Sequence, residues 1–464
     1  MNYDVIIIGS GPGGYVAAIR ASQLGMKVGV VEKSELGGVC LNWGCIPTKA
    51  LLKSGEVYRN LTHAKDYGIA IDGNIKPDFE AMVKRSRETA NGMSKGIQYL
   101  FKKNKIEHIQ GRGKIIDKKT VEVTTEDDKK EKYTAEHVIL ATGARSKELP
   151  NIKQDGKKII GYREAMTLEK QPKSMIIVGS GAIGTEFANF YNDIGTEVTL
   201  VEFLPRIVPI EDEEVSKQLA RSFKKRGVKV MTGASVENVE IKDDVCKATI
   251  KGKKGEEQKE ADVVLMAVGV TPNLEDLGLE EMNIEKDDQG KIKVDEYYRT
   301  NIEGVYAIGD IIAGPALAHV ASAEGITCVE KIAGKEPEPI DYNSIPSCTY
   351  STPEVASVGL TEKAAKDAGY EIKVGKFPFT ASGKASAAGE KDGFVKLIFD
   401  EKYGELIGAH LVGAHVTEMI SELVLGKKIE VTGHEIIKSI HPHPTMSEAI
   451  MEAAAAAYDE VIHI

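Results

Sequence analysis

The fold is decided by a sequence motif near the start of the chain, which is repeated later with a few substitutions. Residues 6–14 read IIIGSGPGG, and residues 176–184 read IIVGSGAIG. In both copies an apolar run meets a glycine-rich turn, which leads into a helical pattern and a second strand that ends in Glu32 or Glu202. A strand, a glycine-rich turn, a helix and an acid-terminated strand form the complete signature of a dinucleotide-binding unit. The alternative, two purely structural turns, would have to produce this signature twice.

The glycines of each copy have separate tasks. The first permits a tight turn, the second lets a pyrophosphate approach the backbone, and the third lets helix and strand pack closely. The phosphates then lie at a helix N-terminus, where unpaired N–H groups favour negative charge. We expect contacts to the first nucleotide from Gly9, Gly11, Gly14 and Glu32, and to the second from Gly179, Gly181, Ile183, Gly184 and Glu202.

Each copy is followed by a run of short predicted strands. Lys114–Tyr133 alternates around the charged stretch Glu126–Lys132, and Val236–Glu260 alternates around Lys251–Glu260. We interpret both charged stretches as solvated hairpin tips. The strands that follow lead into turns where further nucleotide contacts are expected, from Thr142, Gly143 and Gly269.

The bulk composition narrows the class of protein. A chain of 464 residues exceeds what one hydrophobic core organises, so about two to four domains are expected. The net charge of −10 argues against nucleic acid or an anionic membrane as partner. No apolar run approaches the roughly 18 residues of a membrane-spanning helix, and the N-terminus shows no secretory signal. Five cysteines do not form a disulfide scaffold, which favours a reducing cytoplasm.

A cysteine pair lies shortly after Glu32, in the stretch GGVCLNWGCIPTK at residues 37–49. Cys40 and Cys45 are five residues apart in a glycine-rich turn and can close a small disulfide loop. Pro47 suits the first turn of a helix, so we expect Cys45 just before a helix N-terminus, where the dipole favours a thiolate. A zinc half-site and two buried structural thiols are the alternatives. A redox pair is favoured because the other three cysteines are isolated.

This stretch resembles the redox-active segment of the flavoprotein disulfide reductase family, and the resemblance extends over essentially the whole chain. It implies that Cys40 is the interchange thiol that meets substrate and that Cys45 is the thiol against the flavin. Lys49 would lie near the flavin ring and pair with Glu186, which follows the second glycine turn. The implied cofactors are FAD and NAD.

The cysteine pair lies beside the first copy, which we therefore assign to FAD, leaving the second copy for NAD. The stretch TNIEGVYAIGD at residues 300–310 resembles the second FAD contact of the family, with Asp310 on the ribityl chain. Leu317, Ala318 and His319 resemble the segment that meets the edge of the flavin ring. Taken alone, residues 309–310 would be read as a strand-ending turn.

Near the end of the chain stands HPHPTMSE at residues 441–448. The alternating prolines restrict the backbone, which suits a side chain that must be aimed. His443 and Glu448 resemble the His–Glu dyad of the family, in which the acid orients the imidazole as a base. A His-x-His metal site and a structural loop histidine are the rivals, and no metal is expected. In the family this dyad serves the opposite subunit, which implies a homodimer.

The predicted fold class is α/β, with two Rossmann-like dinucleotide-binding domains and a C-terminal α+β dimerisation domain. Domain boundaries are expected after residues 145, 272 and 340. They delimit an FAD-binding domain over 1–145, an NAD-binding domain over 146–272, a central domain over 273–340 that completes the FAD site, and an interface domain over 341–464.

The amino-acid sequences of the cysteine segment and of the histidine segment resemble those of the family branch that oxidises dihydrolipoyl groups and reduces NAD+. The paired arginines that bind a 2′-phosphate in other branches are missing after Glu202, although Arg206 leaves NADP open. The implied partners are lipoyl-bearing carrier domains with the acyltransferase core of a 2-oxo acid dehydrogenase complex, or a glycine cleavage carrier protein. The alternatives are an NADH-dependent reductase of another low-molecular-weight disulfide and a non-catalytic redox-sensing flavoprotein.

Overall fold

The computed structural model describes residues 2–464, which form two compact units. The first unit comprises the chain up to Leu51 with Glu80–Lys147 and Val270–Ile340. The second comprises Leu52–Phe79, Glu148–Gly269 and Asp341–Ile464. The two glycine-rich copies therefore lie in different units. The division into four domains stays a prediction.

The first unit is built on a seven-stranded sheet in the order β3-β2-β1-β6-β5-β4, with β17 also paired to β6. Its β-branched strands, such as VIII at the end of β1, are buried and provide the core of the unit. The strands are β1 (Asn2–Ile8), β2 (Val28–Glu32), β3 (Glu107–Gln110), β4 (Arg112–Asp117), β5 (Thr120–Thr124), β6 (Lys130–Leu140) and β17 (Val305–Ala307). A separate pair joins β7 (Ala144–Ser146) to β16 (Val270–Pro272).

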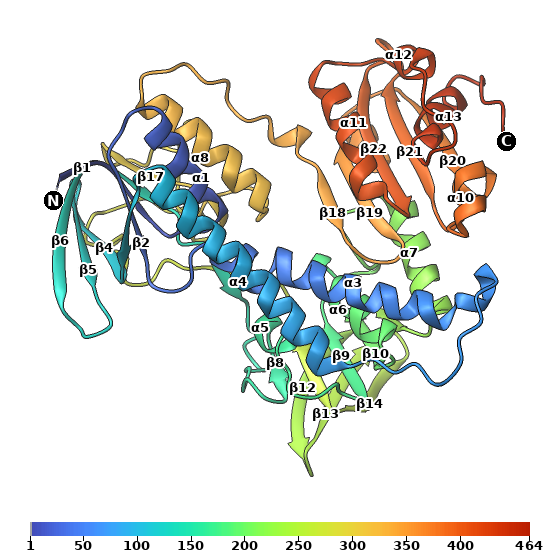
Figure 1. Cartoon of the computed structure of the whole chain (residues 1–464). Coiled ribbons are helices and arrows are strands. Elements are labelled where there is room, and N and C mark those ends of the chain that lie inside the picture. The colour runs from blue at the N-terminus through green and yellow to red at the C-terminus, as the bar shows by residue number, and fades with distance from the viewer. Residues whose placement is uncertain (1) are drawn as a thin grey trace. The chain divides into compact units, whose positions relative to one another are not determined.

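Helix α1 (Pro12–Gln23) packs closely against α8 (Ala318–Ile332), and Figure 1 shows the two side by side. Their contact face is made of small residues. A Cβ added at Gly325 would lie 2.7 Å from the carbonyl oxygen of Gly13, and one added at Gly13 would lie 3.2 Å from that of Ala321. The two helix backbones therefore touch directly. The other helices that begin or run in this unit are α2 (Gly38–Trp43), α3 (Cys45–Thr62), α4 (Phe79–Lys103) and the short η2 (Gly309–Ile311).

The second unit contains a five-stranded parallel sheet in the order β11-β10-β9-β15-β8. Its strands are β8 (Ile159–Ile160), β9 (Ser174–Val178), β10 (Glu197–Glu202), β11 (Lys229–Thr232) and β15 (Val263–Met266). Its helices are α5 (Tyr162–Ala165), α6 (Ala182–Asp193) and α7 (Glu213–Lys225), with η1 (Ala64–Tyr67) before them. The β9–α6–β10 order repeats β1–α1–β2 of the first unit.

A three-stranded antiparallel sheet extends this region, with β12 (Ser235–Lys242), β13 (Val245–Gly252) and β14 (Gly255–Ala261). It corrects the expectation that Lys251–Glu260 is a hairpin tip. Most of that charged stretch is strand β14, which lies at the sheet edge and exposes most of its side chains. Charged residues suit an edge strand because they discourage pairing with another chain. In the first unit, Glu126–Lys132 does span the turn between β5 and β6.

The C-terminal part of the second unit is a five-stranded antiparallel sheet in the order β18-β19-β22-β21-β20. Helix α11 (Val416–Lys428) packs on β19 and β22 (Figure 1). The strands are β18 (Ser347–Thr349), β19 (Glu354–Gly359), β20 (Ile372–Pro378), β21 (Phe394–Asp400) and β22 (Leu406–Gly413). The remaining helices are η3 (Tyr342–Ser344), α9 (Glu362–Asp367), η4 (Phe379–Ala381), α10 (Gly383–Ala388), α12 (Gly433–Lys438) and α13 (Glu448–Ala456).

One face of this sheet carries a row of polar side chains at paired positions. Ser347 pairs with Ser357, Ser357 with His410, and His410 with Lys396. Directly paired residues lie on the same face of a sheet. Lys396 is 2% exposed, yet it stays charged, because acidic side chains surround its ammonium group.

The partner of this row is the acidic turn 211–214 that begins α7. Asp212 lies 3.1 Å from Lys396 Nζ through Oδ1, and Glu214 lies 3.1 Å from it through Oε2. Glu211 accepts a 3.3 Å hydrogen bond from Ser347, while its Oε2 has no partner. Burial raises the pKa of Glu211 to about 7. The contact between turn 211–214 and the C-terminal sheet thus joins the region of the five-stranded parallel sheet to the C-terminal sheet of this unit. The contact is buried and contains a titratable group, Glu211.

The predicted fold class is confirmed, with two Rossmann-like regions and a C-terminal mixed region. Among residues 2–464, no helix is both long enough and apolar enough to cross a lipid bilayer.

Candidate functional site

The first glycine-rich turn has the tight geometry that its sequence predicts. Gly9 has a left-handed backbone with φ of 107°, and a Cβ added there would lie 2.2 Å from the carbonyl oxygen of Ala141. A Cβ added at Gly14 would lie 1.9 Å from the carbonyl oxygen of Gly9. At Gly11, by contrast, an added Cβ would meet nothing within 4 Å. Two glycines thus close the turn, and the third leaves an open approach to the backbone.

Glu32, at the end of β2, is fixed by three hydrogen bonds. Its Oε2 accepts from the Ser10 backbone N–H at 2.9 Å and from the Ser10 hydroxyl at 2.7 Å. Its Oε1 accepts from the Ser34 backbone N–H at 2.9 Å. The carboxylate is therefore aimed by the same turn that holds the glycines.

The second turn reproduces this arrangement in the other unit. A Cβ added at Gly179 would lie 2.3 Å from the carbonyl oxygen of Ala267, and one at Gly184 would lie 2.0 Å from that of Gly179. Gly181 is again open. Glu202 Oε2 accepts from the Ser180 backbone at 2.8 Å and from its hydroxyl at 2.7 Å, and the Leu204 N–H donates to Oε1 at 2.8 Å.

Both turns fit the phosphates of a dinucleotide. Helices α1 and α6 begin after Gly11 and Gly181, and neither of these residues supplies a side-chain cap to the free N–H groups. The open space at both glycines leaves room for an anion to reach those donors. Ile183 lies in the first turn of α6. Gly269 follows β15 with a left-handed backbone, and a Cβ there would be unobstructed.

Thr142 and Gly143 are hydrogen-bonded to Asn273, which belongs to a distant chain segment of the first unit. The Thr142 hydroxyl donates to the carbonyl of Asn273 at 2.7 Å, and the Asn273 amide donates to the Thr142 carbonyl at 3.0 Å. The Asn273 N–H donates to the Gly143 carbonyl at 2.9 Å. The sequence offered no sign of Asn273, because it lies far along the chain.

Asp310 also fits a ligand that donates hydrogen bonds. It lies in η2 and is half-buried. Burial raises the pKa of Asp310, against the lowering effect of Lys291. A sugar-alcohol hydroxyl is a group that can donate a hydrogen bond to this carboxylate. Leu317 precedes α8, and Ala318 and His319 form its first turn, which has no side-chain cap.

The cysteine segment is more helical than expected. Cys40 lies inside α2, Gly44 ends that helix, and Cys45 is the first residue of α3. The prediction that Cys45 precedes the helix was wrong by one residue, because the chain breaks at Gly44 and turns into α3 immediately. Cys45 still lies in the first turn, where the dipole favours a thiolate.

The segment is anchored to the first glycine-rich turn. Gly38 has a left-handed backbone, and a Cβ added there would lie 2.6 Å from Gly11 Cα. The Gly37 N–H donates to the Ser10 carbonyl at 3.1 Å. Between the cysteines, the Arg87 guanidinium lies 4.0 Å from the centre of the Trp43 ring. These contacts hold the cysteine pair beside the proposed pyrophosphate position.

Cys40 and Cys45 are both reduced, and they interact with one another. A hydrogen bond with Cys45 and burial raise the pKa of Cys40, while the charge of Lys49 opposes this effect. The roles that the family resemblance implies for the two thiols stay predictions.

Lys49 and Glu186 lie in different units, so their pairing also stays a prediction. Lys49 is in α3, one turn after Cys45. Glu186 is a buried residue of α6, and its Oε1 accepts a hydrogen bond from the Tyr350 N–H at 3.1 Å.

His443 and Glu448 form a close pair. His443 Nδ1 lies 2.8 Å from Glu448 Oε1, and the imidazole is 78% exposed. Glu448 begins α13, and its Oε2 accepts from the Thr445 N–H at 2.8 Å. Burial raises the pKa of Glu448, but the hydrogen bonds from Thr445 and His443 outweigh it and leave the pKa lowered. The acid is thus kept as a carboxylate that orients one ring nitrogen, while the other remains available.

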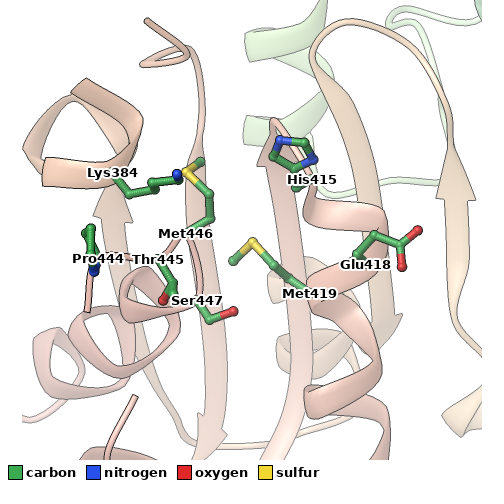
Figure 2. Close-up of a pocket in the computed structure, with 8 residues that line it drawn as sticks. All are labelled: Lys384, His415, Glu418, Met419, Pro444, Thr445, Met446 and Ser447. Atoms are coloured by element: carbon green, nitrogen blue, oxygen red, sulfur yellow. The ribbon is translucent and has the colours of Figure 1, made fainter. Parts of the chain in front are cut away.

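The neighbouring His441 has partners of its own. Its Nε2 lies 2.9 Å from Glu422 Oε1, and its Nδ1 lies 3.0 Å from the Ser439 carbonyl. The loop after His443 borders a cavity of about 410 Å³. Figure 2 shows its lining, which is formed by Lys384, His415, Glu418, Met419, Pro444, Thr445, Met446 and Ser447. None of these was predicted from the sequence, since they come from three separate stretches.

Comparison with known proteins gives matches over nearly the whole chain. Residues 3–325 match the family model described as pyridine nucleotide-disulphide oxidoreductase, and residues 345–454 match the dimerisation domain of that family. Among curated relatives, the dihydrolipoyl dehydrogenase of Rhizobium etli is 49% identical, covering 100% of this chain and 99% of the relative. The enzyme of the same name from Bacillus subtilis is 44% identical, covering 99% of both.

Solved structures resemble the chain as well. LpdA from Mycobacterium tuberculosis has a TM-score of 0.90 at 28% identity, covering 97% of this chain and 98% of that one. The flavoprotein disulfide reductase RclA from Escherichia coli has a TM-score of 0.88 at 24% identity, covering 98% and 99%, which supports the fold alone.

Proposed function

Because this chain belongs to the pyridine nucleotide-disulphide oxidoreductase family, we propose that it is a dihydrolipoyl dehydrogenase that uses FAD and NAD+. The observation that carries the proposal is the position of the cysteine pair, whose Gly38 packs on Gly11 of the first nucleotide turn. This contact supports dithiol chemistry beside the proposed FAD site.

The first half of the reaction uses the cysteines in their disulfide form. A substrate thiolate attacks Cys40 Sγ, the bond to Cys45 breaks, and Cys45 leaves as a thiolate. The second substrate thiol then loses its proton and attacks the first substrate sulfur. This step releases Cys40, which takes up a proton, and closes the lipoyl disulfide. Two electrons now reside in the cysteine pair.

His443 is proposed to be the base that takes the substrate protons. Its Nδ1 is held by Glu448, which leaves Nε2 of this exposed imidazole for proton transfer. In the proposed homodimer, His443 of one chain serves the cysteines of the other. The dimerisation-domain match over residues 345–454 supports this arrangement.

The first nucleotide turn, with Asp310 and the start of α8, is proposed to hold FAD, and the second turn is proposed to hold NAD+. When bound, the flavin supplies two-electron transfer between the dithiol and the nicotinamide. Lys49 and Glu186 are proposed to pair beside the flavin ring. The proposed partners are lipoyl-bearing carrier domains of a 2-oxo acid dehydrogenase complex or of glycine cleavage.

The direct test is NADH formation by the purified holoprotein with dihydrolipoamide, compared with reduced glutathione and with NADP+ as acceptor. We expect turnover with dihydrolipoamide and NAD+. If the protein oxidised only another dithiol, the proposed substrate would be wrong. A protein that binds flavin but turns over no dithiol would contradict the enzyme assignment.

Two variants separate the roles of the site residues. His443→Gln should slow dithiol oxidation by about 10²- to 10⁴-fold at unchanged flavin content, because a positioned base contributes on that scale. Cys45→Ser should abolish dithiol oxidation. His463→Gln is the matched control, since His463 also pairs with a glutamate, Glu452, but on the last segment of the chain. Equal losses in the His443 and His463 variants would refute the base assignment.

A further inference from the structure

We infer that Ser180 and Ser10 are positioning residues that aim Glu202 and Glu32 at the ribose hydroxyls of the bound dinucleotides. The inference rests on the proposed function, because it assumes that both turns bind a nucleotide. It concerns the residue between the first two glycines of each turn, which the glycine signature itself leaves unspecified.

The hydroxyls of the two serines make the same contact in both units. Ser10 Oγ and Ser180 Oγ each donate to Oε2 of the acidic residue at 2.7 Å. The backbone N–H of the same serine donates to the same oxygen, at 2.9 Å in the first turn and 2.8 Å in the second. The two copies of the repeat have thus kept one geometry, which indicates a shared task.

Both serines are fully buried, so their hydroxyls cannot meet a ligand themselves. Ser180 acts through Glu202, and Ser10 acts through Glu32, while the Ser10 hydroxyl oxygen also accepts a 3.3 Å hydrogen bond from the Gly37 N–H. Glu32 and Glu202 are themselves 9% and 7% exposed. A carboxylate with so little exposed surface reaches a ligand only in one orientation. A charge-assisted hydrogen bond to Oε2 is the means of fixing that orientation.

The pattern of donors also identifies the oxygen that faces the ribose. A carboxylate has about four acceptor sites, two on each oxygen. Oε2 uses both of its sites for the serine. Oε1 uses one, for the backbone N–H of Ser34 or Leu204. The remaining site on Oε1 is therefore the one that accepts from a ribose hydroxyl.

The test is a double-mutant cycle on the second turn, with direct binding of ADP-ribose measured by calorimetry on the holoprotein. Ser180→Ala should weaken binding roughly tenfold, because it removes one hydrogen bond to a charged group. Glu202→Ala should weaken it more. In the Glu202→Ala background, Ser180→Ala should have no further effect, because the serine acts only through the acid.

Four controls accompany the double-mutant cycle. Ser180→Thr retains the hydroxyl and should restore binding, and the melting temperature of each variant shows whether it is folded. Ser180→Ala should leave the flavin absorbance unchanged. In the first turn, Ser10→Ala should instead speed the release of FAD on dilution and leave ADP-ribose binding unchanged.

The outcomes distinguish the inference from the proposed function. A wild-type chain that binds no ADP-ribose would overturn the proposed function. Unchanged binding in Ser180→Ala would overturn the positioning role alone. An equal loss in the wild-type and Glu202→Ala backgrounds would also overturn it, since the serine would then act on something other than Glu202.

Discussion

The two glycine-rich regions share one frame and differ in what the chain does next. In both, the turn is closed by glycines and the acid is held by a buried serine. After Glu32 the chain folds back over the turn as the cysteine segment, with the Gly37 N–H donating to the Ser10 carbonyl. After Glu202 the chain instead leads to the acidic turn 211–214, which docks on the C-terminal sheet.

The second region makes the matching contact without glycine. There the Val208 N–H donates to the Ser180 carbonyl at 3.1 Å, with Val208 at φ of 39°. A positive φ is strained for a β-branched residue, whereas Gly37 adopts it without cost. The difference teaches that the frame of the turn is common to both copies, whereas the segment after the acid carries the cysteine pair in one copy and the docking turn in the other.

The largest expected effect comes from Gly14→Ala, compared with Gly184→Ala. In both variants the new Cβ would meet the carbonyl oxygen of the first glycine, at 1.9 Å and 2.0 Å. Gly14→Ala should give colourless protein with no activity, because α1 also packs by backbone contact on α8. Gly184→Ala should keep the flavin absorbance and lose NAD+ binding. Absorbance spectra and calorimetry give the answer.

If the two variants failed alike, losing flavin and NAD+ binding together, the assignment of one nucleotide to each copy would be wrong. Gly181→Ala serves as a milder companion in the second copy, since an added Cβ there meets no protein atom. That variant should fold normally and weaken NAD+ binding only, because the methyl group lies in the path of the phosphates.

A smaller effect is expected from the docking contact that only the second copy has. The pKa of Glu211 is raised to about 7, so the folded state holds a proton that the unfolded state releases near 4.5. This proton contributes its full stabilisation below pH 4.5. The free energy of unfolding then falls by about 3 kcal/mol as the pH rises to 7. Glu211→Gln should remove this dependence. The melting temperature of the variant relative to that of the wild type should therefore increase between pH 5 and pH 8.

The neighbouring Glu213→Gln is the control for that experiment, because Glu213 is 50% exposed. Its difference from wild type should not change with pH. A pH-independent difference in Glu211→Gln as well would show that Glu211 is ionised throughout and that the docking contact does not titrate.

The smallest effect concerns the choice between NAD and NADP. Arg206 lies 3.0 Å from Glu213 in an exposed ion pair, and such pairs are worth about 0–1 kcal/mol. Glu213→Gln should therefore free Arg206 and tighten the binding of 2′-phospho-ADP-ribose by at most a few fold, with ADP-ribose unchanged. If the affinity for both ligands increased equally, Arg206 would not be the residue that recognises the 2′-phosphate.

Local motifs in the sequence predicted much of the fold and of the candidate site. The glycines, Glu32 and Glu202 could be found because the signature depends on short spacings, and His443 with Glu448 because they are only five residues apart. Contacts between distant segments could not be found. Asn273 beside Thr142 and Lys396 beside Asp212 depend on tertiary packing that no short pattern records.

Two other features were visible in the sequence and were misread or overlooked. Ser10 and Ser180 occupy the same place in the repeat, but only the hydrogen bonds reveal their contact with the acids. The Lys251–Glu260 stretch was assigned to a turn because its charges suggested solvent, although an edge strand exposes its side chains equally well.

The glycine contact between α1 and α8 has a consequence for the cofactor as a whole. One helix starts where the phosphates of FAD are proposed to lie, and the other starts at residues 317–319, where the ring edge is proposed to lie. With backbone against backbone at Gly13 and Gly325, no layer of side chains can slide or change rotamer between them. The two helices would therefore hold the proposed phosphate contact and the proposed ring contact at a fixed separation, and FAD would have to bind at the length that this separation allows.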